Sequence, residues 1–322
     1  MKLKIKDLEL DSNIILAPMA GFSDTSFRQI IRSFSKKSLV CTEMISSEAL
    51  MWNKSQDICQ SEKIEKPISY QLSGHKPDLM AKGALKLEGQ ADIIDINMGC
   101  PVAKIVKNQD GSALMKNPNL AFDIVKEVKS VIKKPLSIKM RLGFDNNSKN
   151  YLEFAQKMEE AGADMIVVHG RTRSQMYSGE VDYEAIKKIK KTVTIPIIAN
   201  GDITTLEKAI EVLKTTKADG LMIGRGAIGQ PELIHRIEYF LDKGEILPEL
   251  SLKERIDVLI RHLNLELKYY REPINALKFM RKFYAYYIRD IRGASQYREK
   301  LVKAESFNEI FSILEEIRNI SY

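Results

Sequence analysis

The sequence predicts an α/β protein, a closed (β/α)8 TIM barrel followed by a small all-helical C-terminal domain. Three observations favour this fold. Eight short runs rich in apolar and β-branched residues recur between residues 13 and 225, helix-like segments separate them, and no strand pattern appears after Ser251. Strands that alternate with helices form right-handed βαβ units and a parallel sheet, and eight such units suit a closed barrel.

The expected elements follow one another in a regular order. A short hairpin is expected at residues 2–10, ahead of the barrel. The eight barrel strands are expected at residues 13–19, 39–44, 67–72, 92–97, 136–141, 164–169, 195–200 and 220–225. Capping residues mark three helix starts, which are Asp24, Asn117 with Pro118, and Ser251 with Glu254 as a capping box. We therefore expect residues 1–241 to form the barrel domain, 242–250 a linker and 251–322 a helical domain.

The composition is that of an ordinary globular protein and excludes several other classes. Of the 322 residues, 44% are hydrophobic and 29% are charged, and no apolar run is long enough for a transmembrane helix. The amino terminus is charged, unlike a signal peptide. Cys41, Cys59 and Cys100 cannot all pair, and their spacing is not typical of a zinc site. We expect a cytoplasmic protein with no membrane segment, no metal and no obligatory protein partner.

Positive charge is concentrated in the expected helical domain. The chain has a net charge of +7, and residues 261–303 alone contain eleven Lys or Arg against four Asp or Glu. The same segment holds eight aromatic residues, which are Tyr269, Tyr270, Phe279, Phe283, Tyr284, Tyr286, Tyr287 and Tyr297. Basic residues interleaved with aromatic ones are typical of a surface that contacts phosphates and stacks on bases. A helical bundle with an aromatic core and solvated charges explains the pattern equally well.

A thiol follows the fourth barrel strand directly. Cys100 stands in the turn Gly99-Cys100-Pro101, so it lies on a loop at the carboxyl end of a strand. A free cysteine is most often a small buried hydrophobe. Here polar residues surround it, with Asn97 before it and Lys104 after it. So polar a segment belongs at a surface or in a cleft.

The other strands also end in polar or sharply turning residues, at the face where the sites of barrel enzymes form. These residues include Pro18, Met19, Glu43, Gln71, Asn97, Lys139, Arg141, His169, Arg171, Arg173, Asn200, Gly224 and Arg225. Lys139 alternates with apolar neighbours, so we expect it to point into the barrel. An interior lysine either forms a Schiff base or holds a negative charge.

Two glycine-containing loops favour a phosphate site. Residues 224–229 match the GxGxxG pattern, which opens a βαβ unit in an open dinucleotide-binding sheet, the alternative fold. Here the pattern follows the last strand instead. In a barrel, the loops after the seventh and eighth strands commonly bind phosphate. Those loops contain Asn200-Gly201-Asp202 and Gly224-Arg225, so we expect a flat anionic cofactor between them and the Cys100 loop.

Taken together, these motifs resemble those of the tRNA-dihydrouridine synthase family, nearest its bacterial B-type branch. The matching segments are Ala17-Pro18-Met19-Ala20-Gly21 with Asp24 and Phe27-Arg28, Gln71-Leu72-Ser73-Gly74, Asn97-Met98-Gly99-Cys100-Pro101, Gly111-Ser112-Ala113-Leu114-Met115, Lys139-Met140-Arg141-Leu142-Gly143, His169-Gly170-Arg171-Thr172-Arg173, Tyr177-Ser178-Gly179, Asn200-Gly201-Asp202-Ile203 and Gly224-Arg225-Gly226-Ala227. The resemblance spans the expected barrel and extends more weakly through the helical part.

The resemblance implies an enzyme that uses FMN and NADPH to reduce the C5–C6 double bond of uridines in tRNA. Hydride would pass from flavin N5 to C6, and Cys100 would give a proton to C5. The implied FMN-binding residues are Ala17, Pro18, Met19, Gln71, Lys139 and His169, with the phosphate at Asn200, Gly201, Asp202, Gly224 and Arg225. Asn97 would lie beside the target uracil, and the candidate RNA contacts are Lys104, Arg171, Arg173, Arg281 and Lys282.

Other functions remain open at this point. Uridines of ribosomal RNA are an alternative substrate, and a flavin barrel acting on a small pyrimidine is another, although a free base needs no basic helical appendage. A catalytically idle RNA-binding or assembly protein would lack flavin. A Schiff-base lyase would use Lys139 as its nucleophile.

Overall fold

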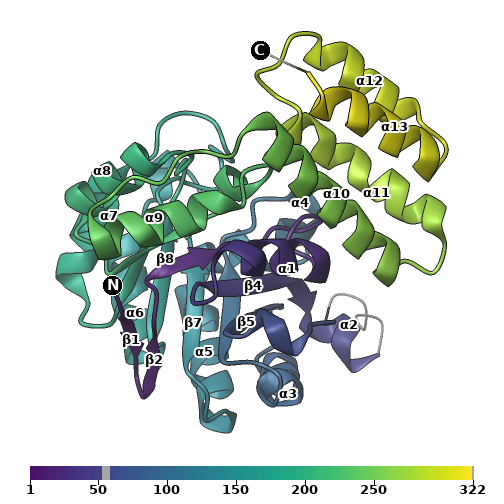
Figure 1. The fold of residues 1–322 in the computed structure, drawn as a ribbon. Coiled ribbons are helices and arrows are strands. Elements are labelled where there is room, and N and C mark those ends of the chain that lie inside the picture. The colour runs from purple at the N-terminus through teal and green to yellow at the C-terminus, as the bar shows by residue number, and fades with distance from the viewer. Residues whose placement is uncertain (53–58, 321–322) are drawn as a thin grey trace.

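The computed structural model describes residues 1–52 and 59–320. Residues 53–58 of the expected barrel domain and 321–322 of the expected helical domain lie outside the described part. Eight parallel strands close into a barrel in chain order, with the last strand paired to the first (Figure 1). Helices surround this barrel, so the predicted fold class is confirmed.

All eight predicted barrel strands form, and the hairpin precedes them. The strands are β1 Leu3–Ile5, β2 Leu8–Leu10, β3 Ile14–Leu16, β4 Leu39–Ser46, β5 Ile68–Ser73, β6 Ile93–Met98, β7 Leu136–Met140, β8 Met165–His169, β9 Ile197–Asn200 and β10 Gly220–Ile223. β1 and β2 pair antiparallel as a separate hairpin. Most strand ends fall within two residues of the predicted ones.

Thirteen α-helices are described. They are α1 Thr25–Phe34, α2 Ser47–Met51, α3 Pro77–Glu88, α4 Ala103–Lys107, α5 Pro118–Val131, α6 Tyr151–Glu160, α7 Tyr183–Thr192, α8 Leu206–Thr216, α9 Glu232–Lys243, α10 Leu252–Tyr269, α11 Pro273–Tyr287, α12 Ala294–Lys303 and α13 Phe307–Arg318. Short 3-10 helices are η1 Lys63–Glu65, η2 Gly111–Lys116, η3 Asn146–Ser148 and η4 Arg225–Ala227. The predicted caps are present, since Asp24 accepts the Phe27 N–H and Ser251 forms its capping box with Glu254. No helix of the described ranges is long and apolar enough to span a bilayer.

Apolar side chains fill the amino-terminal half of the barrel interior. Leu39, Ile93 and Met165, each the first residue of its strand, belong to one cluster with Leu3 and Ile5 of the hairpin. The hairpin therefore packs against the amino-terminal end of the barrel. Because side chains alternate between the two faces of a strand, the residues two and four positions further along point inward above this cluster. A site inside the barrel can open only at the carboxyl ends of the strands.

The last four helices form a separate layer at one side of the barrel, beside α1 (green to yellow in Figure 1). The segment between α9 and α10 contains no helix or strand. α10 packs against α1, and α11 and α13 pack against α10. The helical part is thus attached to the barrel mainly through the first barrel helix.

Candidate active site

Five strands place polar side chains on the inner face at the carboxyl end of the barrel. The residues are Gln71, Asn97, Lys139, His169 and Asn200. Asn97 pairs with Lys139 across β6 and β7, and His169 pairs with Asn200 across β8 and β9. Lys139 is half-buried and the other four side chains are buried. The structure thus brings these predicted site residues together around one space.

Cys100 lies at the edge of this space. It is half-buried on the turn between β6 and α4, and its N–H donates to Asn97 Oδ1 at 2.9 Å. The Cys100 carbonyl accepts from the Ser112 hydroxyl at 2.8 Å, which ties the turn to η2. Burial raises the pKa of the Cys100 thiol above its ordinary value. The sulfur is therefore protonated at neutral pH and able to give up a proton.

The charges around the site are positive. Burial, and then Arg141, lowers the pKa of Lys139 to about 8, which leaves most of the ammonium charged at pH 7. Burial also lowers the pKa of Arg141 to about 10, although its guanidinium donates to the Gly99 carbonyl at 2.8 Å. Burial and the nearby cations lower the pKa of His169 well below its usual value, so its imidazole is neutral. A site with this field favours an anion.

The two predicted phosphate loops meet at Asp202. Its carboxylate accepts from Arg171 and, at 2.7 Å, from Arg225, an arginine that is 51% exposed. Two buried polar atoms here, His169 Nε2 and Arg171 Nη1, have no hydrogen-bond partner within the described residues. Buried polar groups are almost always paired, so these two atoms could serve as hydrogen-bond partners for a bound cofactor. An anionic cofactor with several acceptor atoms fits this set of residues.

The remaining predicted cofactor residues line the same edge. The Ala17 N–H donates to the Ile223 carbonyl at 2.8 Å, which joins the first and last strands of the barrel. A Cβ placed on Gly224 would meet only Met19 and Ala17, at 3.5 and 3.6 Å. Pro18 and Met19 are half-buried beside it. These residues therefore surround the mouth together with the loops after β9 and β10.

The predicted RNA contacts fall in three different environments. Lys104 is exposed on α4, next to Cys100. Arg173 is half-buried over the Phe144 ring, 5.0 Å from its centroid. Arg171 is not on the exposed rim where we expected it, because it is 1% exposed and donates to the carbonyls of Ser178 and Gly179. It therefore holds the loop after β8 in place.

Arg281 and Lys282 lie where α11 meets the barrel. Both are half-buried. The Lys282 ammonium is 3.2 Å from the centroid of the Phe279 ring and 5.1 Å from that of Phe22, and it faces Gly21 in the loop after β3. Lys282 thus lies between the helical part and the barrel.

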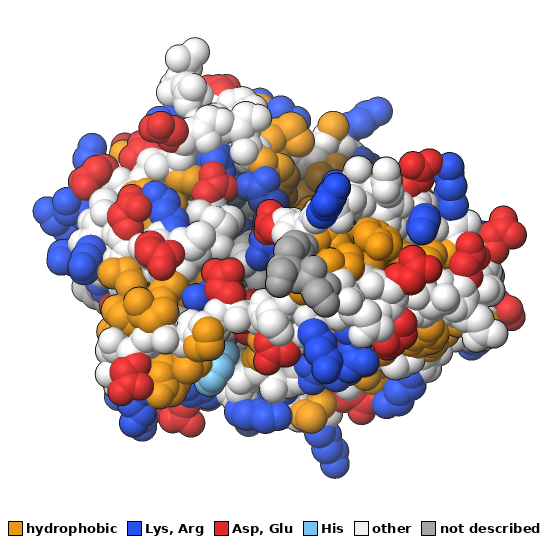
Figure 2. Space-filling view, turned by 45° about the horizontal axis from the view of Figure 1, so that its top comes forward, with side chains coloured by type: hydrophobic (Ala, Val, Ile, Leu, Met, Phe, Trp, Pro, Cys, Tyr) orange, Lys and Arg blue, Asp and Glu red, His pale blue; other side chains and the backbone are white. Residues whose placement is uncertain are grey.

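The aromatic residues of the helical part belong mostly to its core. All eight are at least half-buried, and Phe283, Tyr284 and Tyr287 are fully buried. The structure therefore favours the bundle interpretation for the aromatic residues, while basic residues such as Lys278 are exposed. Figure 2 shows Lys and Arg side chains spread over one face, mixed with acidic and apolar ones rather than gathered in one patch.

Sequence reasoning missed a buried cluster between the barrel and the helical part. Asp24, His262 and Glu266 bring potential ligand atoms within 4.8 Å of one another, the one such metal-capable group among the described residues. Burial raises the pKa of both Asp24 and Glu266 to about 7 and lowers that of His262 to about 4. Protons and the nearby Lys282 ammonium compensate the carboxylates. The spacing of His262 and Glu266 by four residues on the buried face of α10 was the available signal.

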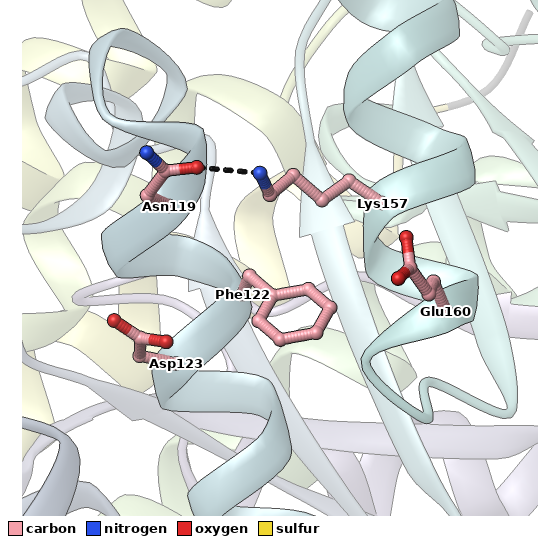
Figure 3. A pocket seen from close by; sticks show the side chains of 5 residues that line it. All are labelled: Asn119, Phe122, Asp123, Lys157 and Glu160. Atoms are coloured by element: carbon pink, nitrogen blue, oxygen red, sulfur yellow. Dashed lines mark hydrogen bonds between the residues drawn. The ribbon is translucent and has the colours of Figure 1, made fainter.

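A pocket lies outside this site, on the outer wall of the barrel. Figure 3 shows it between α5 and α6, where Lys157 Nζ donates to Asn119 Oδ1 at 2.5 Å over the Phe122 ring. Asp123 and Glu160 complete its lining. None of the predicted site residues takes part in it.

Comparison with known proteins agrees with this geometry. A family profile described as dihydrouridine synthase (Dus) matches residues 15–320. The chain belongs to this family. A "Probable tRNA-dihydrouridine synthase" of Rickettsia conorii is 41% identical over 300 residues, covering 92% of this chain and 90% of that protein. The "tRNA-dihydrouridine synthase B" of Vibrio cholerae is 39% identical over 316 residues, covering 97% of this chain and 98% of that protein.

Membership of the dihydrouridine synthase family makes the chain a flavin-dependent oxidoreductase. A solved structure of an old yellow enzyme homologue from Zymomonas mobilis shares the fold, with a TM-score of 0.51 and 14% identity over 77% of this chain and 94% of that one. The predicted family and fold class are confirmed. The roles of individual site residues stay predictions.

Proposed function

We propose that this dihydrouridine synthase uses FMN and NADPH to reduce the C5–C6 double bond of uridines in tRNA. One observation carries the proposal: an inward-pointing ammonium on β7 and a protonated thiol on the turn after β6 lie at the same end of one barrel. The first can hold an anionic flavin and the second can act as an acid. The printed names of the relatives support tRNA as the substrate.

The flavin site uses residues from both sides of the barrel mouth. FMN, when bound, supplies the hydride that reaches C6 of uracil, and NADPH restores it. In the proposal, Ala17, Pro18 and Met19 would hold the flavin through their backbone, together with Gln71 and His169. The loops that contain Asn200, Gly201, Asp202, Gly224 and Arg225 take the phosphate. Lys139 would hold the flavin through its ammonium, whose positive charge favours an anionic ring.

Cys100 and Asn97 act on the uracil side. Cys100 would give its proton to C5 of the uracil, and its thiolate would then take a proton from water. Asn97 directs its Oδ1 to the Cys100 N–H at 2.9 Å, so it fixes the turn that carries the acid. The half-buried thiol is protonated at neutral pH, as an acid requires.

A uridine stacked in folded RNA must turn out of the stack to enter the barrel, at a cost of a few kcal/mol. In the proposal, Lys104, Arg173, Arg281 and Lys282 offset this cost by binding the surrounding backbone, and residues 251–322 form an RNA-binding domain on the barrel domain 1–241. Arg171 shapes the rim from within. Because tRNA is the proposed substrate, we expect the reaction to take place in the cytoplasm.

Cys100→Ala tests the assignment. The variant should bind flavin and let NADPH reduce it at the wild-type rate, because the thiol is not needed for either step. Its rate of dihydrouridine formation in tRNA should fall by roughly 10² to 10⁴, the usual contribution of a general acid. Cys59→Ala, which removes another half-buried thiol, is the control and should keep full activity. A Cys100→Ala enzyme with wild-type turnover would rule out the proposed acid.

Two further assays separate the proposed substrate from its alternatives. Free uracil and orotate should remain unreduced by the wild-type enzyme without RNA. Dihydrouridine should disappear from tRNA, and persist in ribosomal RNA, in cells that lack the protein. Activity on the free base, or a loss confined to ribosomal RNA, would contradict the proposal.

A further inference from the structure

Asp95 is a buried carboxylate beneath the site, and the proposed chemistry does not use it. It is 3% exposed and lies on the inner face of β6, two residues before Asn97. It pairs in register with Gln71 of β5 on one side and with Ser137 of β7 on the other. Three adjacent strands therefore place three polar side chains in one row, one layer below Asn97 and Lys139.

Hydrogen bonds connect this row to the Cys100 turn. Gln71 Nε2 donates to Asp95 Oδ2 at 2.6 Å, and the Ser137 hydroxyl donates to Asp95 Oδ1. Gln71 Oε1 accepts from Asn97 Nδ2 at 2.8 Å. Asn97 Oδ1 in turn accepts the N–H groups of Gly99 and Cys100, at 3.2 and 2.9 Å. We call this chain of contacts, from Asp95 through Gln71 and Asn97 to Cys100, the relay.

The relay has a direction, and Asp95 sets it. Each amide side chain has a donor end and an acceptor end, so either could turn by 180°. A carboxylate only accepts, so the Gln71 NH2 group must face Asp95 and its oxygen must face Asn97. The Asn97 NH2 group is then used by Gln71, which leaves its oxygen for the Cys100 turn. The opposite direction would place an NH2 group against two backbone N–H groups.

We propose that Asp95 is a positioning residue, which holds the Cys100 turn in place by fixing the direction of the Gln71 and Asn97 amides. The proposed effect of Asp95 on the Cys100 turn is inferred from these hydrogen bonds and does not depend on the proposed function. Its consequence for uridine reduction rests on the proposed function. Asp95 lies one layer below Asn97 and Lys139, so it acts only through other side chains.

The charges around Asp95 agree with a carboxylate that accepts from both sides. Burial raises the pKa of Asp95 to about 6, while its bonds from Ser137 and Gln71 and the Lys139 ammonium oppose that rise. The other titratable group that faces it is the thiol of Cys41 on β4, whose pKa burial raises far above the neutral range. Asp95 is thus ionised at pH 7, with Lys139 as its counter-charge.

Alkylation of Cys100 by iodoacetamide tests the proposal without flavin or RNA. The protein is the full chain as apoprotein with Cys59→Ala, since Cys41 is buried. Asp95→Leu removes the acceptor but keeps a similar volume, so the turn should loosen and the thiol should lose its partial burial. Alkylation should then be about tenfold faster, as for a thiol pKa one unit lower. In Asp95→Asn the amide oxygen can still accept from Gln71 while its NH2 group donates to the Ser137 hydroxyl, so this variant should stay close to wild type.

Turnover of the FMN-loaded enzyme gives the second readout. Asp95→Leu should slow uridine reduction by about 10²-fold, the effect of displacing a reacting group by about 1 Å. The reduction of flavin by NADPH should stay at its wild-type rate, and Asp95→Asn should restore most of the loss. A merely structural loss would slow both steps together.

The outcomes separate the possibilities. An unchanged rate of Cys100 alkylation in a folded Asp95→Leu protein would overturn the proposal. Alkylation of Asp95→Asn as fast as that of Asp95→Leu would also overturn it, because the effect would then come from the lost charge. If Asp95→Leu does not fold, Gln71→Met breaks the relay at its middle, and wild-type alkylation in that variant overturns the proposal equally. A wild-type enzyme that fails to reduce uridine would refute the proposed function alone, because the alkylation comparison would still decide the role of Asp95.

Discussion

Gly229 lies directly against the backbone of Tyr286, so closely that a Cβ on Gly229 would approach the Tyr286 carbonyl to under 3.0 Å. The two residues join the end of the barrel to α11 of the helical part. Gly229 also has a φ of +75°, a conformation that residues with a Cβ rarely adopt. Glycine is therefore required here for two independent reasons, and the close approach to Tyr286 is the one that concerns the attachment of the helical part.

Gly229→Ala should lower the free energy of unfolding by about 2–4 kcal/mol, from backbone strain plus a contact that neither backbone can relieve. Gly244→Ala is the matched control, since Gly244 also has a φ of +75° but nothing lies within 4 Å of its Cβ position. That control should lose only about 1 kcal/mol. Urea unfolding measures both. Equal losses would show that the approach of Gly229 to Tyr286 contributes nothing.

The local patterns of the sequence were sufficient to predict the barrel and the direction of its inner side chains. Alternation along β7 placed Lys139 inward because the strand is regular and both faces are buried. Helix starts such as Asp24 were predicted because a cap depends only on neighbours in the chain. Features that depend only on residues close together in the chain, such as strand alternation and helix caps, could therefore be predicted from the sequence.

Features that depend on distant contacts were not accessible. Arg171 follows a strand like other rim residues, but the loop after β8 folds back over it and buries it. Asp24 meets Glu266 only because α1 packs against α10. Asp95 was predicted only as a strand residue, because its neighbours in the sequence do not show that Gln71 of β5 and Ser137 of β7 donate hydrogen bonds to it. Each of these depends on pairing between elements far apart in the chain.

The cluster between α1 and α10 should make stability fall as pH rises through neutrality. The folded-state pKa values of Asp24 and Glu266, about 7, lie above the ordinary values of 3.8 and 4.5. The folded protein therefore retains protons that the unfolded chain has released, and linkage makes this stabilisation disappear as pH rises toward and past 7. His262 affects stability in the opposite direction. Its folded-state pKa is about 4, so the unfolded chain takes up a proton first and stability falls as pH drops below 6.5. Of the three residues in the cluster, only the two carboxyls therefore change stability with pH above pH 6.5.

Thermal unfolding between pH 6.5 and 8 should therefore reveal a loss of about 1 kcal/mol in the wild type. Glu266→Gln removes one titrating group and should flatten this dependence, so that the variant gains relative to wild type at the higher pH. Glu43, Lys282 and Tyr287 also face the cluster and stay unchanged in the comparison. Glu153→Gln on α6, an exposed glutamate, should leave the dependence as it is. A Glu266→Gln protein with the wild-type slope would contradict this account.

The affinity of the apoprotein for FMN should weaken as pH rises through about 8. Lys139, with its pKa lowered to about 8, is charged below that pH and neutral above it. A charge-assisted contact contributes about 1.5–3 kcal/mol, so the dissociation constant should rise about tenfold or more. Fluorescence titration measures it. Lys139→Gln should bind FMN weakly at every pH. Lys139→Arg should bind FMN tightly at every pH, because arginine stays charged. A wild-type dissociation constant that does not change from pH 7 to 9.5 would exclude Lys139 from the flavin site.

Charge reversal on the outer face of α11 should weaken RNA binding without affecting flavin. Lys278 is exposed on α11, one turn before Arg281, so Lys278→Glu should remove a phosphate contact. The affinity for tRNA should fall, and the slope of its logarithm against that of salt concentration should shrink by about 1. Lys214→Glu on α8 changes the net charge equally on a different helix and is the matched control. If both charge reversals weaken tRNA binding equally, the net charge of the protein attracts the RNA rather than the face of α11. If Lys278→Glu loses its flavin, the helical part has no separate RNA-binding role.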